Sequence, residues 1–578
     1  MRQHRTNFFK TLSSGALACW SAAHLCRFLT VAMPSAPKRT KTIIAPNAGG
    51  ASVLSSRERR PIFTSPTAVP KSFVFLALLL TLIPAIPARA SILHPSDYAH
   101  YATEFNTYVP ETITNYISDA QSWDWMQKEI PLFDCPDSEV RELYYFRWWS
   151  FRKHLVQTPQ GFVFTEFFTP VKHAGIYNTI SCAASFHVDE ARWLHDQTYV
   201  DNYIHFWLRG DNGQPEPKFH NYSSWLDSAI YDHYLVDHDT TFVTNLLPDL
   251  DADYHLWQQE HETNGLYWSF DVRDGMEESI SGSRKNHNLR PTINSYMFAN
   301  AEAISAIAEL AGQKHLAKEY HHTAEDLRER IEKSLWDNDA QFFKVRLDNG
   351  KLSDAREELG YVPWMFELPD QSKKYAAAWL ELTNDQGFNA PAGLTTAERR
   401  HPLFRTHGVG NCEWDGAVWP FATSQTLYGL ANSLRDYKHN DLTKRDYFDV
   451  FLTYVHSQHA NGKPYIGEYL DEVTGDWING RADRSRYYNH STFADLLITG
   501  VIGLRPRADK TVEIQPLLPE GVWDWFCLQD VQYHGFSLTI VWDQSGDHYH
   551  QGQGLTLLAD GQPLAHSKSL SNLTGKLP

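Results

Sequence analysis

Acidic residues gather beside aromatic ones at three separate points of this sequence. The first is Asp271-Val-Arg-Asp-Gly-Met-Glu-Glu278, which holds four carboxylates in eight positions and follows the aromatic run Tyr267-Trp-Ser-Phe270. A carboxyl group packed against aromatic rings loses water, which raises its pKa and makes it a usable proton donor. A solvated acidic loop, with Asp274 closing a turn, is the structural alternative for the same residues.

The second point is Glu413-Trp-Asp-Gly-Ala-Val-Trp-Pro420, which follows Asn411 and Cys412 and places two tryptophans and two acids around a glycine. In one interpretation Asp415 caps the helix that follows and the tryptophans fill the core. In the other, Trp414 and Trp419 form the floor of a sugar site and Asp415 accepts hydrogen bonds from sugar hydroxyls. Two tryptophans and two acids around one turn favour the sugar site.

The third point is Glu468, which lies beside Tyr469 in Asn461-Gly-Lys-Pro-Tyr-Ile-Gly-Glu-Tyr-Leu470. Pro464 stiffens the approach, and Gly467 lets the backbone turn or pass close to a ligand. Taken alone, Glu468 reads as a surface acid near a turn. Paired carboxylates and flat apolar rings are, however, what a sugar-cleaving enzyme needs.

Composition limits the classes of partner. The chain has 578 residues, 13% of them aromatic including 19 Trp, and a net charge of -17. This charge argues against nucleic acid, whose phosphates attract a basic face. The aromatic content fits a large core and sugar stacking equally well. The sequence contains no Gly-rich phosphate loop, nucleophile elbow or His-Glu-x-x-His motif.

Helices separated by long loops must position these residues. Apolar spacing between positions 98 and 504 predicts helices, the first two forming a hairpin around Gly312, over 292–311, 313–335, 373–382, 421–434, 447–456 and 491–504. Loops of this length in a compact domain are usually functional. Serial helical hairpins with long loops indicate a helical toroid, and the lack of a fixed-period repeat argues against a solenoid.

The pattern changes after Pro506. Strands with turn signals are predicted at 511–516, 538–542 and 555–558, the last followed by Asp560-Gly561. We therefore predict a catalytic domain over 91–506 and a small β region over 507–578.

The first ninety residues differ from the rest. Positions 72–90 combine an apolar run, a basic flank and an Ala-Arg-Ala ending, which is typical of a secretory signal with cleavage near Ala90. The run is short for a membrane helix and contains Pro84 and Pro87. We expect a secreted protein without stable membrane association after cleavage; a retained leader would make it an anchored one. Sequons at Asn221, Asn489 and Asn572 allow glycosylation.

At these motifs the chain resembles the (α/α)6-barrel glycoside hydrolases related to trehalase, processing α-glucosidase and mannosylglycerate hydrolase, the six-hairpin glycosidases. The Glu413–Pro420 stretch resembles their Trp-containing signature, and Gly275-Met-Glu277 is similar to their Gly-(Trp/Met)-Asp stretch, whose acid is the proton donor. Glu468-Tyr469 is similar to their late Glu stretch, whose Glu is the general base. The three motifs occur in the same order as in these enzymes. Their sequences are also similar to those of β-L-arabinofuranosidase-type members linked to pectin breakdown.

The resemblance implies a mainly α fold, an (α/α)6 toroid with a small C-terminal β region, and an inverting reaction on a carbohydrate without metal or organic cofactor. It implies Glu277 as acid and Glu468 as base. Glu277 stands where relatives have Asp, and Glu278 is adjacent, so either can be the acid. Residues expected at the substrate are Trp414, Asp415, Trp419, Arg290, Asn294 and Asp274.

Two other classes remain open from the sequence. A polysaccharide lyase on a similar toroid would use a tyrosine and a histidine, with Tyr488 and His490 as candidates. A non-catalytic carbohydrate-binding protein would keep the aromatic residues and tolerate substitution of both acids.

Overall fold

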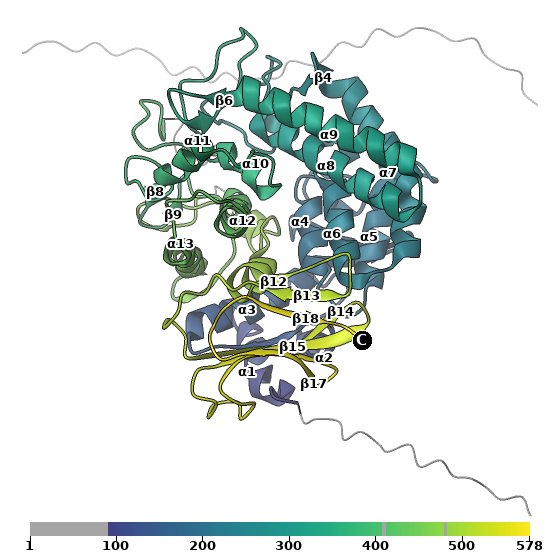
Figure 1. Ribbon diagram of the computed structural model, residues 1–578, viewed down its shortest axis with the longest axis vertical. Coiled ribbons are helices and arrows are strands. Elements are labelled where there is room, and N and C mark those ends of the chain that lie inside the picture. The colour runs from purple at the N-terminus through teal and green to yellow at the C-terminus, as the bar shows by residue number, and fades with distance from the viewer. Residues whose placement is uncertain (1–90, 407–411, 479–481) are drawn as a thin grey trace, which may run out of the picture. The chain divides into compact units, whose positions relative to one another are not determined.

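The computed structural model of the protein describes residues 91–406, 412–478 and 482–578 (Figure 1). The predicted leader, with its signal-like segment at 72–90, lies outside these residues. Within the described ranges, no helix has both the length and the apolar character needed to cross a bilayer. The described part is mainly helical, with β-sheet at its C-terminal end.

Helical segments contact one another in sequence around a ring. In chain order its members are α4 (Ala184–Ala191), α6 (Leu226–Asp237), α8 (Pro291–Leu310), α10 (Val362–Met365), α12 (Pro420–Asp436), and the consecutive α15 (Phe493–Asp495) and π-helical η8 (Leu496–Ile502). Each member packs against the next, and α15 packs against α4. The ring therefore joins elements three hundred residues apart in sequence.

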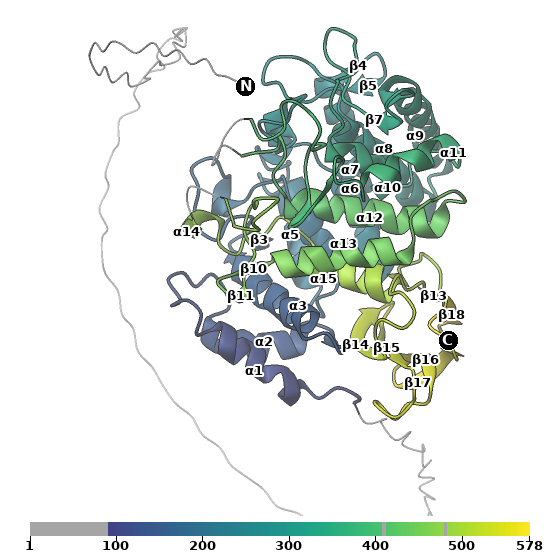
Figure 2. The ribbon, with the colours of Figure 1, turned by 90° about the vertical axis from the view of Figure 1, so that its left-hand side faces the viewer.

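A second set of helices alternates with the first along the chain. Its members are α3 (Ser138–Phe151), α5 (Thr198–Arg209), α7 (Thr240–His261), α9 (Lys314–Leu335), α11 (Lys373–Ala376) and α13 (Lys444–Ser457). The pairs α4 and α5, α6 and α7, α8 and α9, and α12 and α13 are in contact, and Figure 2 shows α12 and α13 side by side. Three further α-helices lie outside these two sets: α1 (Pro95–Phe105), α2 (Ser122–Glu129) and α14 (Ala482–Ser485).

The α8–α9 hairpin follows the sequence pattern closely. Gly312 connects the two helices with φ of 71°, a backbone conformation that suits glycine, as predicted. The apolar stripe of α9 is buried at Tyr320, Ala324, Leu327, Ile331 and Leu335. By contrast, α8 is buried on most sides because it packs against α6, α7, α9 and α10.

Short two-stranded hairpins punctuate the loops. They are β2–β3 (Leu155–Thr158, Gly161–Phe164), β4–β5 (Glu262–Thr263, Leu266–Tyr267), β6–β7 (Trp336–Asp337, Phe342–Phe343), β8–β9 (Asn389–Ala390, Gly393–Leu394) and β10–β11 (His459–Ala460, Lys463–Pro464). Each closes a long connection locally, so that the loops between the helices have defined backbone paths.

The C-terminal region forms two antiparallel sheets. One has the order β1-β14-β15-β16-β17, from Leu132–Asp134, Trp525–Tyr533, Phe536–Asp543, Gly554–Ala559 and Gln562–Ser567, and the other β12-β13-β18, from Leu504–Arg505, Thr511–Ile514 and Leu573–Lys576. Asp560 and Gly561 have φ of 48° and 71° and form the predicted turn between β16 and β17. The edge strand β1 comes from the start of the chain, ahead of α3.

The helix expected over 491–504 is shorter in the structure. It comprises α15 and η8 and ends at Gly503, whose φ is 88°. A Cβ at Gly503 would overlap the backbone of Gln515, so the chain leaves the helix where it meets the β region. Leu504, expected in the helix, begins β12. The segment 373–382 is helical as α11 followed by a 3₁₀ turn at Ala377–Glu381.

The Asn489 sequon is structural. Asn489 is fully buried, and its side chain accepts a hydrogen bond from Arg147 and donates one to the carbonyl of Thr165. A glycan cannot be carried on a side chain in this position. Asn572 is exposed, so it fits the sequon role.

Candidate active site

The three acid-bearing stretches lead into ring helices and are joined by backbone contacts. Residues 262–290 precede α8, 389–419 precede α12, and 458–492 precede α15. The N–H groups of Val418 and Leu470 each donate to the other's carbonyl at 3.0 Å, which joins the second stretch to the third. The charge of Glu468 in turn acts on Glu277, so the first and third stretches face a common site.

Asp274 anchors the first stretch to the start of α8. Its carboxylate accepts a hydrogen bond from Arg290 Nε at 2.5 Å and others from the hydroxyls of Thr292 and Ser223. Both Asp274 and Arg290 are buried. A buried acid with these partners is stabilised as part of the scaffold, and it fixes the position of the residues that follow it.

Gly275 gives the stretch its path. Its φ is 66°, and a Cβ there would lie 2.5 Å from the sulfur of Cys182. Only glycine accommodates both conditions without strain. Cys182 and the other cysteines of the described residues, Cys135, Cys412 and Cys527, are free thiols.

Glu277 is half-buried in poorly solvated surroundings. Burial, helped by the negative charges of Asp271 and Glu468, raises the pKa of Glu277 to about 7 against the opposing charge of Arg284. A carboxyl group with this pKa is substantially protonated near neutrality, which suits a general acid.

The neighbouring Glu278 differs in surroundings. It adopts φ of 68° and pairs with Arg284 at 3.2 Å, at the more exposed side of the stretch. Glu278 is thus engaged in an ion pair, whereas Glu277 lies in poorly solvated surroundings, which favours Glu277 as the proton donor.

Glu468 is buried and held by three hydrogen bonds. Arg484 Nη2 donates to both carboxylate oxygens at 3.0 and 2.9 Å, and Ser485 Oγ donates at 2.7 Å. Gly467 lies against the indole of Trp477, where a Cβ would come within 2.4 Å of the ring. The glycine therefore serves the close approach of an aromatic ring, and the acid beside it is buried, contrary to the surface-turn interpretation.

Sequence reasoning missed a third carboxyl group at this site, Glu166. It follows β3, is buried, and accepts a hydrogen bond from Tyr488 Oη at 2.5 Å. Burial raises the pKa of Glu166 to about 8, and the charges of Glu468 and Glu277 also raise it. The available signal was an acid inside an aromatic run, Phe164-Thr-Glu-Phe-Phe168, which is an unusual setting for an exposed residue.

A small apolar cluster explains the poor solvation. Phe167, Ile180 and Tyr488 form a buried group apart from the main core, and Cys182 and Tyr222 pack against it. The charges of Glu166 and Glu277 act on both Cys182 and Tyr222, so this apolar wall borders the carboxyl groups.

The tryptophans of the second stretch stack on one another and on the third stretch. Trp414 and Trp419 have ring centroids 4.3 Å apart, and Trp419 and Tyr469 are 4.5 Å apart with near-parallel rings. All three rings are almost fully buried. Trp419 therefore packs against Tyr469, the neighbour of Glu468, and supports the segment that carries this acid.

Like Asp274 and Arg290, two more of the expected substrate residues are engaged within the protein. Asp415 does not cap α12, whose N-cap is Trp419, but accepts a hydrogen bond from the Thr406 N–H at 2.8 Å. The Asn294 amide donates to the carbonyls of Tyr267 and Arg290 and accepts from the Tyr267 N–H. Both donors of Asn294 are therefore used to tie β5 to α8, and they are not available to a sugar.

The lyase candidates have surroundings that oppose their use as bases. Tyr488 donates to Glu166, and burial raises the pKa of Tyr488 well above its ordinary range. Burial also disfavours the charged form of His490 and lowers its pKa well below the ordinary value. The ring of His490 meets that of Tyr488 edge-on, with the centroids 4.2 Å apart. A tyrosinate would be costly here, which weighs against a lyase.

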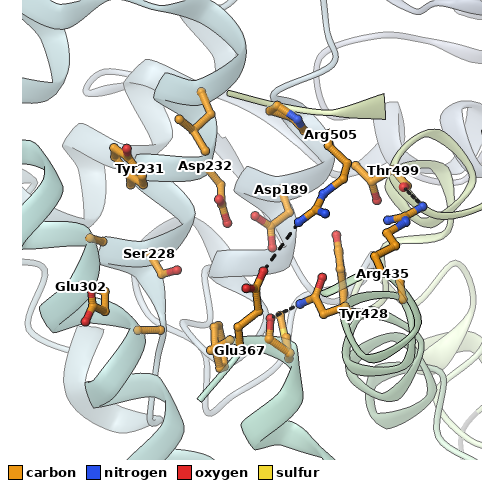
Figure 3. A pocket seen from close by; sticks show the side chains of 18 of the residues that line it. Asp189, Ser228, Tyr231, Asp232, Glu302, Glu367, Tyr428, Arg435, Thr499 and Arg505 are labelled. Carbon is orange, nitrogen blue, oxygen red and sulfur yellow. Dashed lines mark hydrogen bonds and ion pairs between the residues drawn. The ribbon is translucent and has the colours of Figure 1, made fainter. Parts of the chain in front are cut away.

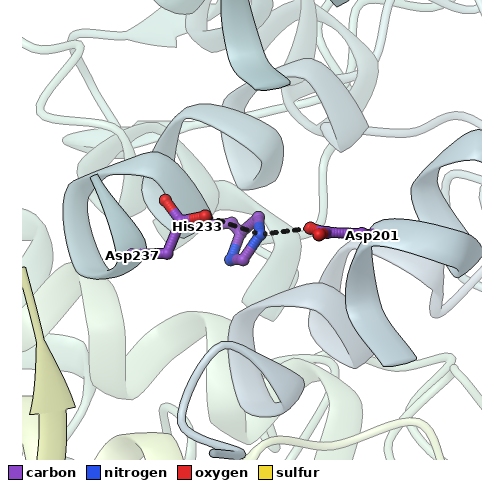
Figure 4. Close-up of side chains that lie close together, drawn as sticks. All are labelled: Asp201, His233 and Asp237. Carbon is purple, nitrogen blue, oxygen red and sulfur yellow. Dashed lines mark hydrogen bonds and ion pairs between the residues drawn. The ribbon is translucent and has the colours of Figure 1, made fainter. Parts of the chain in front are cut away.

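A cluster of potential metal-ligating residues lies away from this site. His233 Nε2 is 3.0 Å from Asp201 and 3.5 Å from Asp237, all on α5 and α6 (Figure 4). One imidazole nitrogen lies close to both carboxylates, and this contact joins the two helices.

Comparison with known proteins places this site in a class. Residues 176–491 match the family described as the mannosylglycerate hydrolase MGH1-like glycoside hydrolase domain, and residues 504–566 match the C-terminal domain of glycosyl hydrolase family 65. The family match defines a glycoside hydrolase domain. The chain belongs to the MGH1-like glycoside hydrolase family, and the predicted resemblance is confirmed.

The chain matches only part of each of its individual relatives. The chain is similar to a solved structure named sialidase, with 49% identity and a TM-score of 0.82 over 84% of this chain and 45% of that one. It is 25% identical over 205 residues to an uncharacterised protein of Borreliella burgdorferi, covering 35% of this chain and 41% of the relative. The chain thus spans less than half the length of either. A rhamnosidase of Bacillus sp. GL1 shares the fold at 13% identity, with a TM-score of 0.52 over 72% of this chain and 40% of that one.

Proposed function

We propose that this chain is a secreted, exo-acting glycoside hydrolase that cleaves a terminal sugar with inversion, and that its ring of helices is an (α/α)6 toroid. One observation carries the proposal: Glu277 and Glu468 act electrostatically on one another from contrasting surroundings. The first is poorly solvated, and its raised pKa of about 7 keeps a substantial fraction protonated near neutrality, while the second is fixed by Arg484 and Ser485. Two carboxyl groups in contrasting surroundings are the pattern of an acid–base pair.

In this mechanism Glu277 gives its proton to the glycosidic oxygen as the bond from that oxygen to the anomeric carbon breaks. Glu468 takes a proton from a water molecule, whose oxygen forms the new bond to the anomeric carbon from the opposite face. The two carboxyl groups should then lie ~6.5–9.5 Å apart. The inner ring of contacts and the alternating second set of helices support the toroid.

The relatives suggest several classes of sugar substrate, and each of them can be tested. The similar solved protein carries the name sialidase, and the motifs resemble β-L-arabinofuranosidase-type enzymes. Aryl glycosides of sialic acid, arabinose, mannose, glucose and rhamnose, together with pectic oligosaccharides, form the panel. The anomeric form of the released sugar, followed by NMR at early times, distinguishes inversion from retention.

Paired variants test the assignment of the residues. Glu277→Gln and Glu468→Gln should each lower hydrolysis at least about 100-fold, the scale of general acid–base catalysis. Glu278→Gln is the matched control and should retain activity within about threefold, since a rim-exposed charge contributes little. If both catalytic substitutions leave hydrolysis within about tenfold, the enzyme uses other residues, whereas sugar binding without hydrolysis by the wild type would identify a carbohydrate-binding protein. An unsaturated product absorbing in the ultraviolet would indicate the lyase instead.

A further inference from the structure

A cavity of about 620 Å³ lies among the C-terminal halves of the ring helices (Figure 3). Its walls come from α4, α6, α8, α9, α10, α12, α13 and η8. The acid-bearing stretches, by contrast, lead into the N-terminal ends of ring helices. On α8 the cavity is lined by positions 298–306, which lie ~12–24 Å along the helix axis from Arg290. None of the residues assigned to the candidate active site lines it.

Three buried polar atoms on this wall have no hydrogen-bond partner among the described residues. They are Oδ1 of Asp189, Nε of Arg328 and Oη of Tyr447. Asp189 is only 3% exposed, and Figure 3 shows its carboxylate directed among the lining side chains. Gly500 makes room for the Tyr447 hydroxyl, since a Cβ there would overlap it. Buried polar groups without partners cost stability unless a water or a ligand satisfies them.

The charges of the wall leave both donors and acceptors available. Arg192 uses Nε and Nη2 on Asp495, while its Nη1 is 3.9 Å from Asp189 and 4.0 Å from Asp232, beyond hydrogen-bond length. Arg435 donates from Nε to the carbonyl of Gln515 and from Nη2 to the carbonyls of Thr499 and Gly500, so these two nitrogens are engaged within the protein. A ligand in this cavity would therefore contact the carboxylates of Asp189 and Asp232 and the Nη1 edge of Arg192.

Aromatic and aliphatic side chains form the rest of the wall. Tyr231, Phe298, Phe366 and Tyr428 line the cavity beside the polar groups. Five acids, Asp189, Asp232, Glu302, Glu325 and Glu367, are offset by the four arginines Arg192, Arg328, Arg435 and Arg505. A simple cation would leave the Nη1 group of Arg192 unsatisfied, and an anion would be repelled by Asp189 and Asp232. Hydroxyl groups donate and accept, so they satisfy both kinds of wall group.

We propose that this cavity is a second binding site, for a small neutral polyhydroxylated molecule such as a monosaccharide, distinct from the hydrolytic site. Carboxylates would accept from its hydroxyls, Arg192 would donate to them, and the aromatic side chains would pack against its carbon-bound hydrogens. The cavity volume falls within the range of small-molecule sites. The proposal does not depend on the assignment of Glu277 and Glu468.

Equilibrium dialysis of the full chain with radiolabelled L-arabinose, D-galactose and glycerol tests the site by counting the molecules bound. Ala306→Trp places an indole on the cavity wall, and Asp232→Asn removes an acceptor at a position that reaches solvent. Glu309→Trp, on the exposed side of the same helix, is the matched control. The expected result is one bound molecule fewer in Ala306→Trp, at least about tenfold weaker binding in Asp232→Asn, and no change in the control.

Several outcomes are decisive. Sugar binding without glycerol binding identifies ring recognition, whereas binding of all three identifies a general polyol site, and both support the proposal. Equal stoichiometry in wild type and Ala306→Trp, with unaltered affinity in Asp232→Asn, overturns it, as does an absence of binding by all three probes. Asp232→Asn keeps the test valid if Ala306→Trp fails to fold. Retained hydrolysis in both variants separates this result from a failure of the hydrolytic site.

Discussion

Arg484 donates from a single nitrogen, Nη2, to both carboxylate oxygens of Glu468, at 3.0 and 2.9 Å. Ser485 adds a third hydrogen bond at 2.7 Å. This arrangement fixes the orientation of the proposed base, while Glu277 keeps the poorly solvated surroundings of a proton donor. The two acids thus have different surroundings, although they face one site from segments some two hundred positions apart in sequence.

Weakening this clamp should slow the chemical step. Arg484→Lys and Ser485→Ala should each lower kcat about 10- to 100-fold with KM nearly unchanged, because they misorient the base without contacting the sugar. Steady-state kinetics on the best substrate of the panel measures both constants. Arg445→Lys, which alters an exposed pair with Asp449, is the control. A rise in KM at constant kcat would instead make Arg484 a substrate-binding residue.

The pH dependence should have its alkaline limb near the pKa of Glu277, which burial raises to about 7. Glu277 must be protonated to act, so kcat/KM should fall as pH rises above this value. Asp271→Asn removes one of the negative charges that raise the pKa, and it should move the limb to lower pH by a fraction of a unit. If the alkaline limb stays at the same pH or moves to higher pH, it does not report the ionisation of Glu277.

The sequence predicted the elements with strong local signals. The α8–α9 hairpin has long amphipathic stripes around a glycine, α12 begins at Pro420, and Asp560-Gly561 suits only a tight turn. The order of the acid-bearing stretches also indicated which segments to compare. Each of these features is decided within about twenty residues of chain, where periodicity and turn chemistry act directly.

Other features depend on distant contacts that no local pattern carries. The three residues of β1 pair with β14 almost four hundred positions later. Asn294 has the composition of a site residue, but its amide is consumed by the backbone at Tyr267 and Arg290. Glu166 belongs to the site only because the fold brings Tyr488, Glu277 and Glu468 to it. Side-chain roles of this kind follow from tertiary packing.

Glu166 should act as a neutral group near pH 6, since its pKa lies at about 8. Glu166→Gln preserves shape and the neutral state, so activity at pH 6 should stay within about threefold of wild type. Glu166→Ala removes the acceptor of the Tyr488 hydroxyl and should lose about tenfold or more, as a buried donor is left unsatisfied. Comparison of kcat/KM at pH 6 tests this. Equal losses in both variants would require Glu166 to act as a charged carboxylate.

Gly275 offers a test of the path that presents Glu277. Gly275→Ala should lower activity and destabilise the protein by about 1–3 kcal/mol, from the positive φ and the overlap with the Cys182 sulfur. Cys182→Ala removes the overlapping atom, and the double variant should recover part of both losses. A double-mutant cycle in urea unfolding and in kcat measures the coupling. Strict additivity would show that the close approach of Cys182 does not constrain this turn.

Stability should reveal the cost of keeping Glu277 poorly solvated. Its pKa rises from an ordinary value of about 4.5 to about 7 on folding. Below pH 4.5 the group is protonated in both states, and as pH rises toward 7 the unfolded state gains stability by ionising. Glu277→Gln does not titrate, so its Tm advantage over wild type should grow between pH 4.5 and 7 and then level off. Differential scanning calorimetry measures this difference, with Glu278→Gln as the control. A Tm difference that is constant with pH, or shrinks, would mean that Glu277 ionises in the folded protein as easily as in the unfolded chain.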